Sequence, residues 1–305
     1  MSRRKSQGRS VSGILLLDKP LHMSSNKALQ IVKRLFNAAK AGHTGSLDPL
    51  ATGMLPICLG EATKVSQYLL EADKVYQVSF KLGERTATGD AEGEVIETKP
   101  CDAVTQQQIE SVIDSFLGES EQIPPMYSAL KHNGQRLYEL ARKGLEVERK
   151  SRRIHISEIE LLSFQQQQVE LKVACSKGTY IRTLAEDVAA ALNTLSYVTQ
   201  LRRLDVGSFS GFPMVTMAQL EELAEQGELQ LDKELLAVDA GIMTMPELRL
   251  NDDLSYYLRL GQAVRVPKAP ANGLVRLYDE KRFLGIGEIN DDGLVAPKRL
   301  MNTQC

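Results

Sequence analysis

Apolar residues recur along this chain with two spacings, one typical of strands and the other of helices. The stretch Gly13-Ile14-Leu15-Leu16-Leu17 is apolar throughout and ends at Asp18-Lys19-Pro20, which predicts a short buried strand. A helix capped by Ser24 or Ser25 should then run to about Asn37, because its apolar positions follow the helical period. The same criteria predict strands at 54–59, 75–80, 94–98, 153–164, 169–175 and 196–206, and helices at 61–70, 104–117, 137–143 and 217–226.

The C-terminal part of the chain has a different pattern. Short strand-like runs separated by turns, at 261–264, 275–278, 284–287 and 294–296, indicate a small β-rich domain joined near 243–248. Elsewhere strands and helices intermix without a regular βαβ rhythm, so we expect an α+β fold with a mixed, mostly antiparallel sheet and flanking helices. The expected organisation is a basic flexible N-terminus (1–10), a large domain (11–245) and the small domain (246–305).

The stretch from His43 to Gly53 follows neither period, although it lies between two stretches that do. Gly45 and Gly53 allow backbone angles that other residues resist, and Pro49 pushes the preceding residue toward an extended conformation. The pattern predicts a rigid loop that presents one carboxylate, Asp48, and chemistry often lies on such loops. A turn with a solvated acid is the alternative that local composition leaves open.

Composition narrows the class of protein. With 305 residues and 43% hydrophobic content, the chain can bury a large core. No apolar stretch reaches membrane-spanning length and no signal-peptide segment is present, so we expect a cytoplasmic protein without membrane contact. The four cysteines are scattered and no histidines cluster, so neither a metal site nor a disulfide framework is expected.

Charge is segregated along the chain, although its net value is only −2. Eight Lys or Arg and three Glu lie from Lys131 to Arg153, whereas seven acids and one lysine lie from Met217 to Ala240. A further basic cluster occupies residues 2–6. This distribution fits one side that faces a polyanion and another that solvates the protein, and simple solvated faces are the alternative.

Three residues besides Asp48 could carry chemistry. Arg182 falls in the first turn of a helix that should begin after Thr179, its expected N-cap, and the helix dipole disfavours a cation there. A nearby carboxylate would explain this position, and if Asp48 is the partner, Arg182 would keep it ionised and aim it. An exposed arginine is the alternative. Tyr76 is either a core aromatic or a stacking platform, and His43 is either a turn residue or a ring that stacks on a nucleotide.

Familiar catalytic templates are missing from the chain. It has no Gly-x-Ser-x-Gly elbow, no Gly-x-x-x-x-Gly-Lys-Ser/Thr loop and no Gly-x-Gly-x-x-Gly fingerprint. Gly285 and Gly287 lie in a strand-like run, which is the wrong setting for a cofactor loop. A reaction without a cofactor is therefore the economical hypothesis.

The motifs resemble those of one family. The run 42–55, Gly-His-Thr-Gly-Ser-Leu-Asp-Pro-Leu-Ala-Thr-Gly-Met-Leu, closely resembles the catalytic motif of the TruB family of tRNA pseudouridine synthases. Four further segments agree with that family: Leu17-Asp18-Lys19-Pro20, Lys74-Val75-Tyr76, Gly178-Thr179-Tyr180-Ile181-Arg182 and Leu201-Arg202-Arg203-Leu204. The C-terminal stretch is similar to the PUA RNA-binding domain of bacterial members. The resemblance implies a sheet core of the pseudouridine synthase type and a PUA-like domain.

The resemblance also implies a reaction. A uridine at position 55 in the TΨC loop of tRNA would become pseudouridine: its ribose C1′–uracil N1 bond breaks and the base is rejoined through C5. Asp48 would be the nucleophile or base, Arg182 its ion-pair partner, and Tyr76 the residue that stacks on uracil and removes the C5 proton. The implied substrate-binding residues are the pocket residues Tyr180 and Leu201, the stacking His43, the buttressing Lys19 and Pro20, and the basic Lys131, Arg142 and Arg202.

The expected partner is the T-arm of tRNA, gripped by a basic insertion at 124–153, and the expected protein is a monomer without a cofactor or metal. Two other functions are compatible with parts of the pattern. A catalytically silent tRNA-binding or tRNA-folding protein could hold a flipped base, but the intact Asp48, Tyr76 and Arg182 argue against it. A hydrolase with Asp48 as nucleophile would need a second catalytic carboxylate or a metal cluster, and the sequence indicates neither.

Overall fold

A large sheet forms the centre of the computed structural model, which describes residues 8–267, 269, 272–280 and 282–302. Its nine strands are β1 (Gly13–Lys19), β2 (Ala41–His43), β3 (Ala51–Leu59), β4 (Lys74–Leu82), β7 (Gly118–Gln122), β10 (Arg152–Gln165), β11 (Gln168–Cys175), β12 (Ser196–Val206) and β13 (Val215–Thr216). They run in the order β13-β1-β3-β12-β4-β11-β10-β7, and β2 also pairs with β3. Only the β1–β13 and β3–β12 pairs are parallel, so the expected mixed, mostly antiparallel sheet is confirmed.

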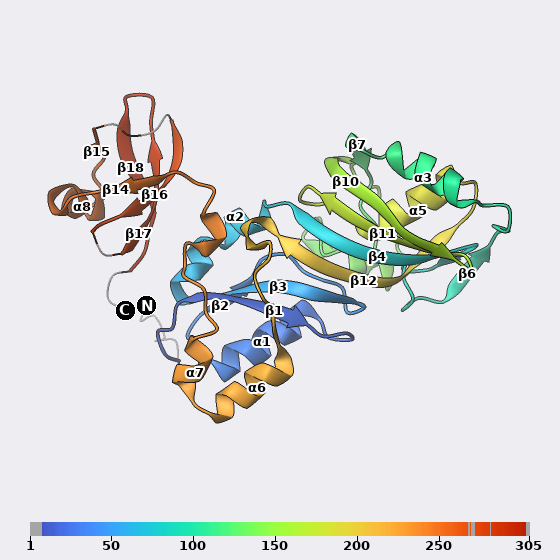
Figure 1. Cartoon of the computed structure of the whole chain (residues 1–305), viewed down its shortest axis with the longest axis horizontal. Helices are drawn as coiled ribbons and strands as arrows, with labels where there is room; N and C mark the ends of the chain where they lie inside the picture. The colour runs from blue at the N-terminus through green and yellow to red at the C-terminus, as the bar shows by residue number, and fades with distance from the viewer. Residues whose placement is uncertain (1–7, 268, 270–271, 281, 303–305) are drawn as a thin grey trace.

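Helices cover the apolar side of this sheet. They are α1 (Ser25–Leu35), α3 (Gln106–Asp114), α5 (Ile181–Ala191), α6 (Met217–Glu225) and the short α7 (Glu228–Asp232). In Figure 1, α1 and α6 lie beside β1 and β3, whereas α3 and α5 lie beside β10 and β12. The core between these layers contains Leu15, Leu55, Phe80 and Val173, which are fully buried. This packing holds in place the strands on either side of the Asp48 loop.

Element boundaries differ from the prediction where local sequence is ambiguous. The strand after the loop begins at Ala51 rather than Met54, and the helix expected at 61–70 is split into a 3₁₀ turn, η1 (Gly60–Lys64), and α2 (Ser66–Leu70). Thr179 is not the N-cap of α5. That position is occupied by Tyr180, while the Thr179 hydroxyl donates to the carbonyl of Ser176, 2.9 Å away, and so stabilises the preceding turn instead.

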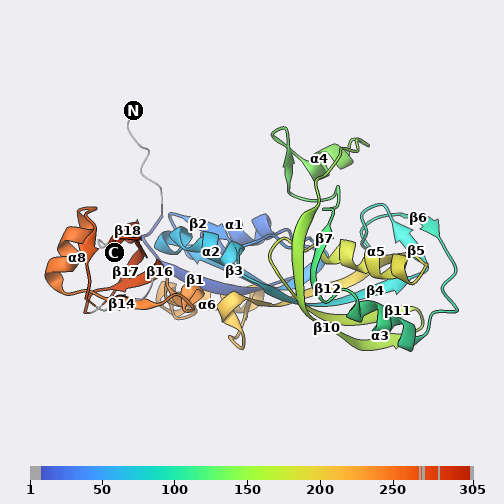
Figure 2. The ribbon, with the colours of Figure 1, turned by 90° about the horizontal axis from the view of Figure 1, so that it is seen from above.

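Two hairpins extend from the large sheet. One is formed by β5 (Glu84–Thr86) and β6 (Val95–Thr98). The other lies in the basic insertion and is formed by β8 (Lys131–His132) and β9 (Gln135–Arg136), followed by α4 (Leu137–Ala141). Figure 2 shows that the α4 segment projects away from the plane of the large sheet.

A second sheet occupies the C-terminal part of the chain. Its strands are β14 (Glu247–Arg249), β15 (Val264–Arg265), β16 (Gly273–Tyr278), β17 (Phe283–Ile289) and β18 (Leu294–Leu300), and α8 (Asp252–Arg259) packs beside it. Leu258, Leu277 and Val295 form a core of their own. Polar contacts link this sheet to the rest of the chain: the Lys64 amine donates to the Leu300 carbonyl at 2.8 Å. Figure 1 places it at the end of the large sheet remote from α3.

Candidate active site

The loop around Asp48 is fixed by backbone hydrogen bonds to neighbouring elements. The Ser25 hydroxyl accepts from the Leu47 N–H at 2.7 Å and donates to the Leu47 carbonyl at 3.0 Å. The Thr44 N–H donates to the Pro56 carbonyl, and the Ala51 N–H donates to the carbonyl of Asp48 itself. These bonds tie both sides of the loop to the rest of the fold, and the Asp48 side chain between them lines the cavities described below.

Arg182 is the ion-pair partner of that carboxylate. Its Nη2 lies 3.0 Å from Oδ2 of Asp48, and its side chain is only 6% exposed whereas that of Asp48 is 42% exposed. The guanidinium also donates to the carbonyls of Thr88 and Tyr127, both at 2.7 Å. The pair explains why a cation occupies the first turn of α5, and it leaves one face of Asp48 open to a ligand.

Opposing effects act on the protonation of Asp48. Burial raises the pKa of its carboxyl above the ordinary value, and the charge of Arg182 is the largest effect in the other direction. Asp90, whose Oδ2 lies 3.7 Å from Nη1 of Arg182, also raises this pKa, whereas Lys19 lowers it. A raised pKa in a cavity, opposed by one aimed cation, is typical of a carboxylate that reacts.

Two cavities meet at this ion pair. The smaller, of about 110 Å³, is lined by Asp48, Arg182, Tyr76, Tyr180 and Leu201 among others. The larger, of about 1040 Å³, shares Asp48 and Arg182 and reaches the basic insertion. A small pocket next to a wide one that reaches the basic insertion suits a polymer that inserts a single group beside the carboxylate.

The walls of the small cavity come from three elements of the fold. Leu201 in β12 is opposite Ala51 of β3 and Val78 of β4, which places it beneath the loop. Tyr180 is held at the start of α5 because its N–H donates to the buried Gln122 side chain at 2.7 Å. Tyr76 lies in β4 and is half-buried, and burial raises the pKa of its phenol. The structure therefore brings these three predicted residues together with Asp48.

Lys19 and Pro20 lie behind the loop rather than in either cavity. The Lys19 side chain is 0% exposed. Its amine donates to the carbonyls of Pro20 at 2.8 Å and Met23 at 2.6 Å, with the Pro49 carbonyl at 3.5 Å. Burial lowers the pKa of Lys19 to about 8, while the charge of Asp48 opposes this shift. The arrangement suits the buttressing role that the resemblance implied.

The remaining predicted contacts belong to the larger cavity. His43, Lys131 and Arg142 line it, and the two basic residues extend from the insertion. Burial lowers the pKa of His43, and its Nδ1 is buried without a hydrogen-bond partner. A neutral ring at the cavity wall suits stacking. Among the described residues, no group of His, Cys, Asp or Glu side chains is arranged to hold a metal ion, and no helix is long and apolar enough to cross a membrane.

Comparison with known proteins decides the family. The chain matches three family models. Residues 33–181 match "TruB family pseudouridylate synthase (N terminal domain)". Residues 182–243 match "tRNA pseudouridylate synthase B C-terminal domain", and residues 246–301 match "Pseudouridine synthase II TruB, C-terminal". It is 54% identical over 303 residues to the tRNA pseudouridine synthase B of Nitrosococcus oceani, covering 99% of this chain and 98% of that protein. It is 53% identical to the protein of the same name from Aeromonas salmonicida, covering 98% of this chain and 96% of that protein. The chain belongs to the TruB family of pseudouridine synthases.

Solved structures with the TruB-type fold are also similar. A chain of the Cbf5-Nop10-Gar1 complex superposes with a TM-score of 0.73 at 25% identity, covering 95% of this chain and 84% of that chain. A chain of the H/ACA RNP bound to a substrate RNA containing 2′-deoxyuridine gives a TM-score of 0.71 at 22% identity, covering 99% and 92%. The α+β fold of pseudouridine synthase type is therefore confirmed.

One predicted residue of this TruB-family chain lies elsewhere. Arg202 does not line either cavity: its guanidinium forms two hydrogen bonds, at 3.0 and 2.8 Å, with the carboxylate of Asp18. Side chains alternate between the two faces of a strand, so Arg202 points away from the face that carries Leu201. The next residue, Arg203, is on the cavity face and fully buried. Because side chains alternate along a strand, the residue two positions after Leu201 shares its face and the residue directly after it does not. This alternation could have distinguished Arg203 from Arg202 in the sequence.

Asp90 and Tyr127 were also missed. Asp90 contacts Arg182 through its carboxylate and Tyr127 through its carbonyl, but both lie in irregular segments without a recognisable pattern.

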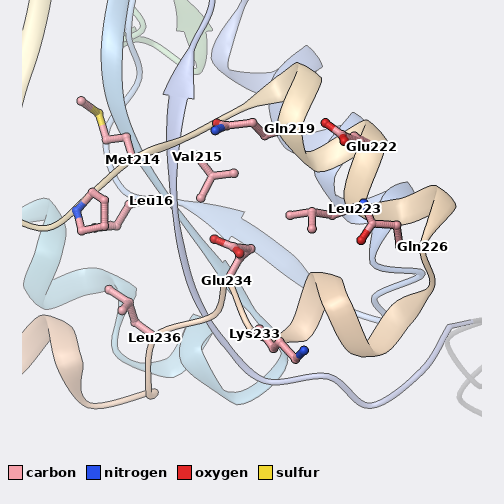
Figure 3. A pocket seen from close by; sticks show the side chains of 11 residues that line it. Leu16, Met214, Val215, Gln219, Glu222, Leu223, Gln226, Lys233, Glu234 and Leu236 are labelled. Atoms are coloured by element: carbon pink, nitrogen blue, oxygen red, sulfur yellow. The ribbon is translucent and has the colours of Figure 1, made fainter.

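A separate cavity of about 500 Å³, shown in Figure 3, lies between β1 and helices α6 and α7. Its floor is apolar, with Leu16, Val215 and Leu223, and it contains none of the predicted site residues of the TruB motif. This cavity is therefore separate from the two cavities that Asp48 lines.

Proposed function

We propose that this chain converts uridine 55 in the TΨC loop of tRNA to pseudouridine, with Asp48 as the residue that starts the reaction. The observation that carries the proposal is the ion pair between Asp48 and the buried Arg182, 3.0 Å apart, at the junction of a base-sized cavity and a wide basic one. The family membership supports the same reaction.

The target base would enter the small cavity after it flips out of the RNA. Tyr76 and Leu201 would contact the uracil, which offsets part of the few kcal/mol that unstacking costs. Asp48 then acts as a nucleophile or base on the bound uridine, and Arg182 stabilises its ionised form. After the detached base turns and C5 bonds to C1′, Tyr76 removes the C5 proton. No atom is gained or lost overall, so the reaction needs no redox partner.

The wide cavity would hold the surrounding RNA. Lys131, Arg136 and Arg142 are exposed along it and would contact phosphates, while the neutral ring of His43 stacks within the loop of the T-arm. We propose residues 124–153 as the gripping insertion, 11–245 as the catalytic domain and 246–305 as the PUA-like RNA-binding domain. A cytoplasmic monomer that acts on free tRNA completes the proposal.

A hydrolase is the alternative that the structure weighs against. Asp90 is a second carboxylate near Asp48, but it is 3% exposed. It accepts hydrogen bonds from the Thr88 hydroxyl and the Glu92 N–H and lies beside Arg182. A carboxylate whose oxygens are engaged by these donors is poorly placed to protonate a leaving group, which a glycosidase pair requires.

Tritium release tests the proposal. Full-length tRNA labelled at uracil C5 should lose tritium to water with the wild-type protein, because C5 exchanges its hydrogen for the bond to C1′. Asp48→Asn should abolish release and keep tRNA binding. Asp114→Asn, an exposed substitution of the same kind in α3, is the matched control and should release tritium at the wild-type rate. A wild-type protein that releases no tritium would refute the proposed function.

A further inference from the structure

Arg203 is a buried cation that has no carboxylate partner among the residues that the structure describes. Its side chain is 1% exposed. Its Nε donates to the Met54 carbonyl at 2.7 Å and its Nη2 to the Gly45 carbonyl at 3.2 Å. The other two arginines near the site have acidic partners, Asp48 and Asp18, but none of the described acids lies within 4.0 Å of Arg203. Burial of an unpaired positive charge is unfavourable. We therefore expect a negative charge to form near Arg203 at some stage of the reaction.

The ionisable group that Arg203 faces is the phenol of Tyr76. The two residues are directly opposite each other in the antiparallel β4–β12 pair, so their side chains share the cavity face. Burial raises the pKa of the Tyr76 phenol, and the charge of the Arg203 guanidinium acts against this rise. The other charged or titratable groups that act on Tyr76 are Cys175 from β11 and Asp48 from the loop, and neither can stabilise negative charge on the phenol.

Other groups around Arg203 cannot compensate its charge. Lys19, Lys74 and His43 each experience its charge, and each is itself basic, so its proximity lowers the pKa of all three. Among the described groups near Arg203, only the phenol of Tyr76 has an anionic form that the positive charge of Arg203 would stabilise. The position of the guanidinium is therefore explained if negative charge forms on that oxygen during the reaction.

We propose that Arg203 is a positioning residue that stabilises the phenolate of Tyr76 while this oxygen accepts the C5 proton. The inference rests on the proposed function, in which Tyr76 is the C5 base. Before the step the Tyr76 phenol gives its proton to water, which leaves on its oxygen the negative charge that Arg203 faces. The phenolate oxygen then forms a bond to the C5 hydrogen, and the C5–H electron pair becomes the C5–C6 double bond. The former C6–N1 double-bond pair moves to N1, which takes a proton from water, so Tyr76 ends the step as the neutral phenol that it was at the start. Oxidation state is unchanged.

Arg203→Gln tests this role because glutamine keeps a donor for the loop carbonyls but removes the charge. Single-turnover rates are measured with full-length tRNA that carries either hydrogen or deuterium at C5 of the target uridine, across a range of pH. We expect a rate loss on the order of 10²-fold, the range of general-base effects. We also expect an isotope effect above the wild-type value and a rate limb displaced to higher pH, because without the cation the pKa of Tyr76 rises further.

Two further variants make the test decisive. Arg202→Gln removes a guanidinium from the other face of the same strand and should leave the C5 isotope effect and the pH limb as in the wild type. Arg203→Lys keeps a charge without the planar fork and should fall between wild type and Arg203→Gln. If Arg203→Gln does not fold, the isotope effect of Arg203→Lys decides.

The inference is overturned if the Arg203 variants are slowed but keep the wild-type isotope effect and pH limb, because that outcome describes a purely structural arginine. It is equally overturned if their rates are unchanged. Failure of the proposed function is a different result, since it would appear as absent tritium release in the wild type.

Discussion

Replacing Arg182 by methionine removes the cation that Asp48 faces while keeping an unbranched side chain in the same buried position. Besides its ion pair with Asp90, the wild-type guanidinium makes three close contacts that methionine cannot: the ion pair with Asp48 at 3.0 Å and the hydrogen bonds to the carbonyls of Thr88 and Tyr127 at 2.7 Å. Each has a separate consequence. The first concerns the reaction, and the other two concern the stability of the fold.

The magnitude follows from these contacts. A charge-assisted hydrogen bond contributes about 1.5–3 kcal/mol, so losing the Asp48 contact in the transition state should slow turnover about 10- to 150-fold. Two carbonyls left without a donor should lower the free energy of unfolding by about 2–6 kcal/mol. The uncompensated charge of Asp48 adds less than a fully buried charge would, because 42% of that side chain is exposed to water.

The pH dependence supplies a second signature. Burial raises the pKa of Asp48, and Arg182 is the strongest opposing influence, so this pKa should rise further in Arg182→Met. The reaction needs the ionised carboxylate, which is lost as pH falls through the folded-state pKa. The acidic limb of the rate profile should therefore move to higher pH in the variant.

The assay measures single-turnover tritium release and tRNA affinity for the same preparations. Arg85→Met is a matched control: it removes an arginine whose partner Glu97 is 2.7 Å away, but both side chains are about half exposed, at 47% and 49%. Such exposed pairs contribute about 0–1 kcal/mol, so neither turnover nor affinity should change. Unchanged turnover in Arg182→Met, or an acidic limb that stays at its wild-type position, would refute the catalytic role of the pair.

Three further outcomes are expected. Replacing both Arg136 and Arg142 by glutamine should weaken tRNA binding and reduce the slope of log affinity against log salt by about 2, as phosphate contacts of the insertion require; an unchanged slope, measured by filter binding, would exclude such contacts. Gly53→Ala should lower the free energy of unfolding by at least about 1–3 kcal/mol, because φ of Gly53 is +95° and the added Cβ would lie 2.2 Å from a backbone oxygen of β12. Thermal unfolding measures this loss, and wild-type stability would contradict the geometry. Ser25→Ala should cost about 1–3 kcal/mol by leaving the buried Leu47 N–H without its acceptor, and a loss of turnover larger than the loss of stability would show that the loop position matters for the reaction.

The sequence alone determined much of the fold and part of the site, because those features depend on neighbours along the chain. The apolar run at 13–17 and the capped helix at 25–35 formed as predicted, since short-range periodicity and a side-chain cap specify them. The loop at 43–53 was recognisable because glycine and proline act on their own backbone. Arg182 was conspicuous for the same local reason, a cation in the first turn of a helix.

Only the tertiary structure decided which side chains meet. Which of Arg202 and Arg203 lies opposite Tyr76 depends on the register of β12 against β4. The strand β12 also joins β3, from a distant part of the sequence, in a parallel pair. Asp90 and Tyr127 contact Arg182 from segments that have no period of their own. Local patterns specify the direction in which a side chain leaves its own element, but the partner it finds there is set by long-range packing. The sequence therefore identified the carboxylate and its cation, and the fold supplied the second carboxylate, the carbonyls and the buried arginine that surround them.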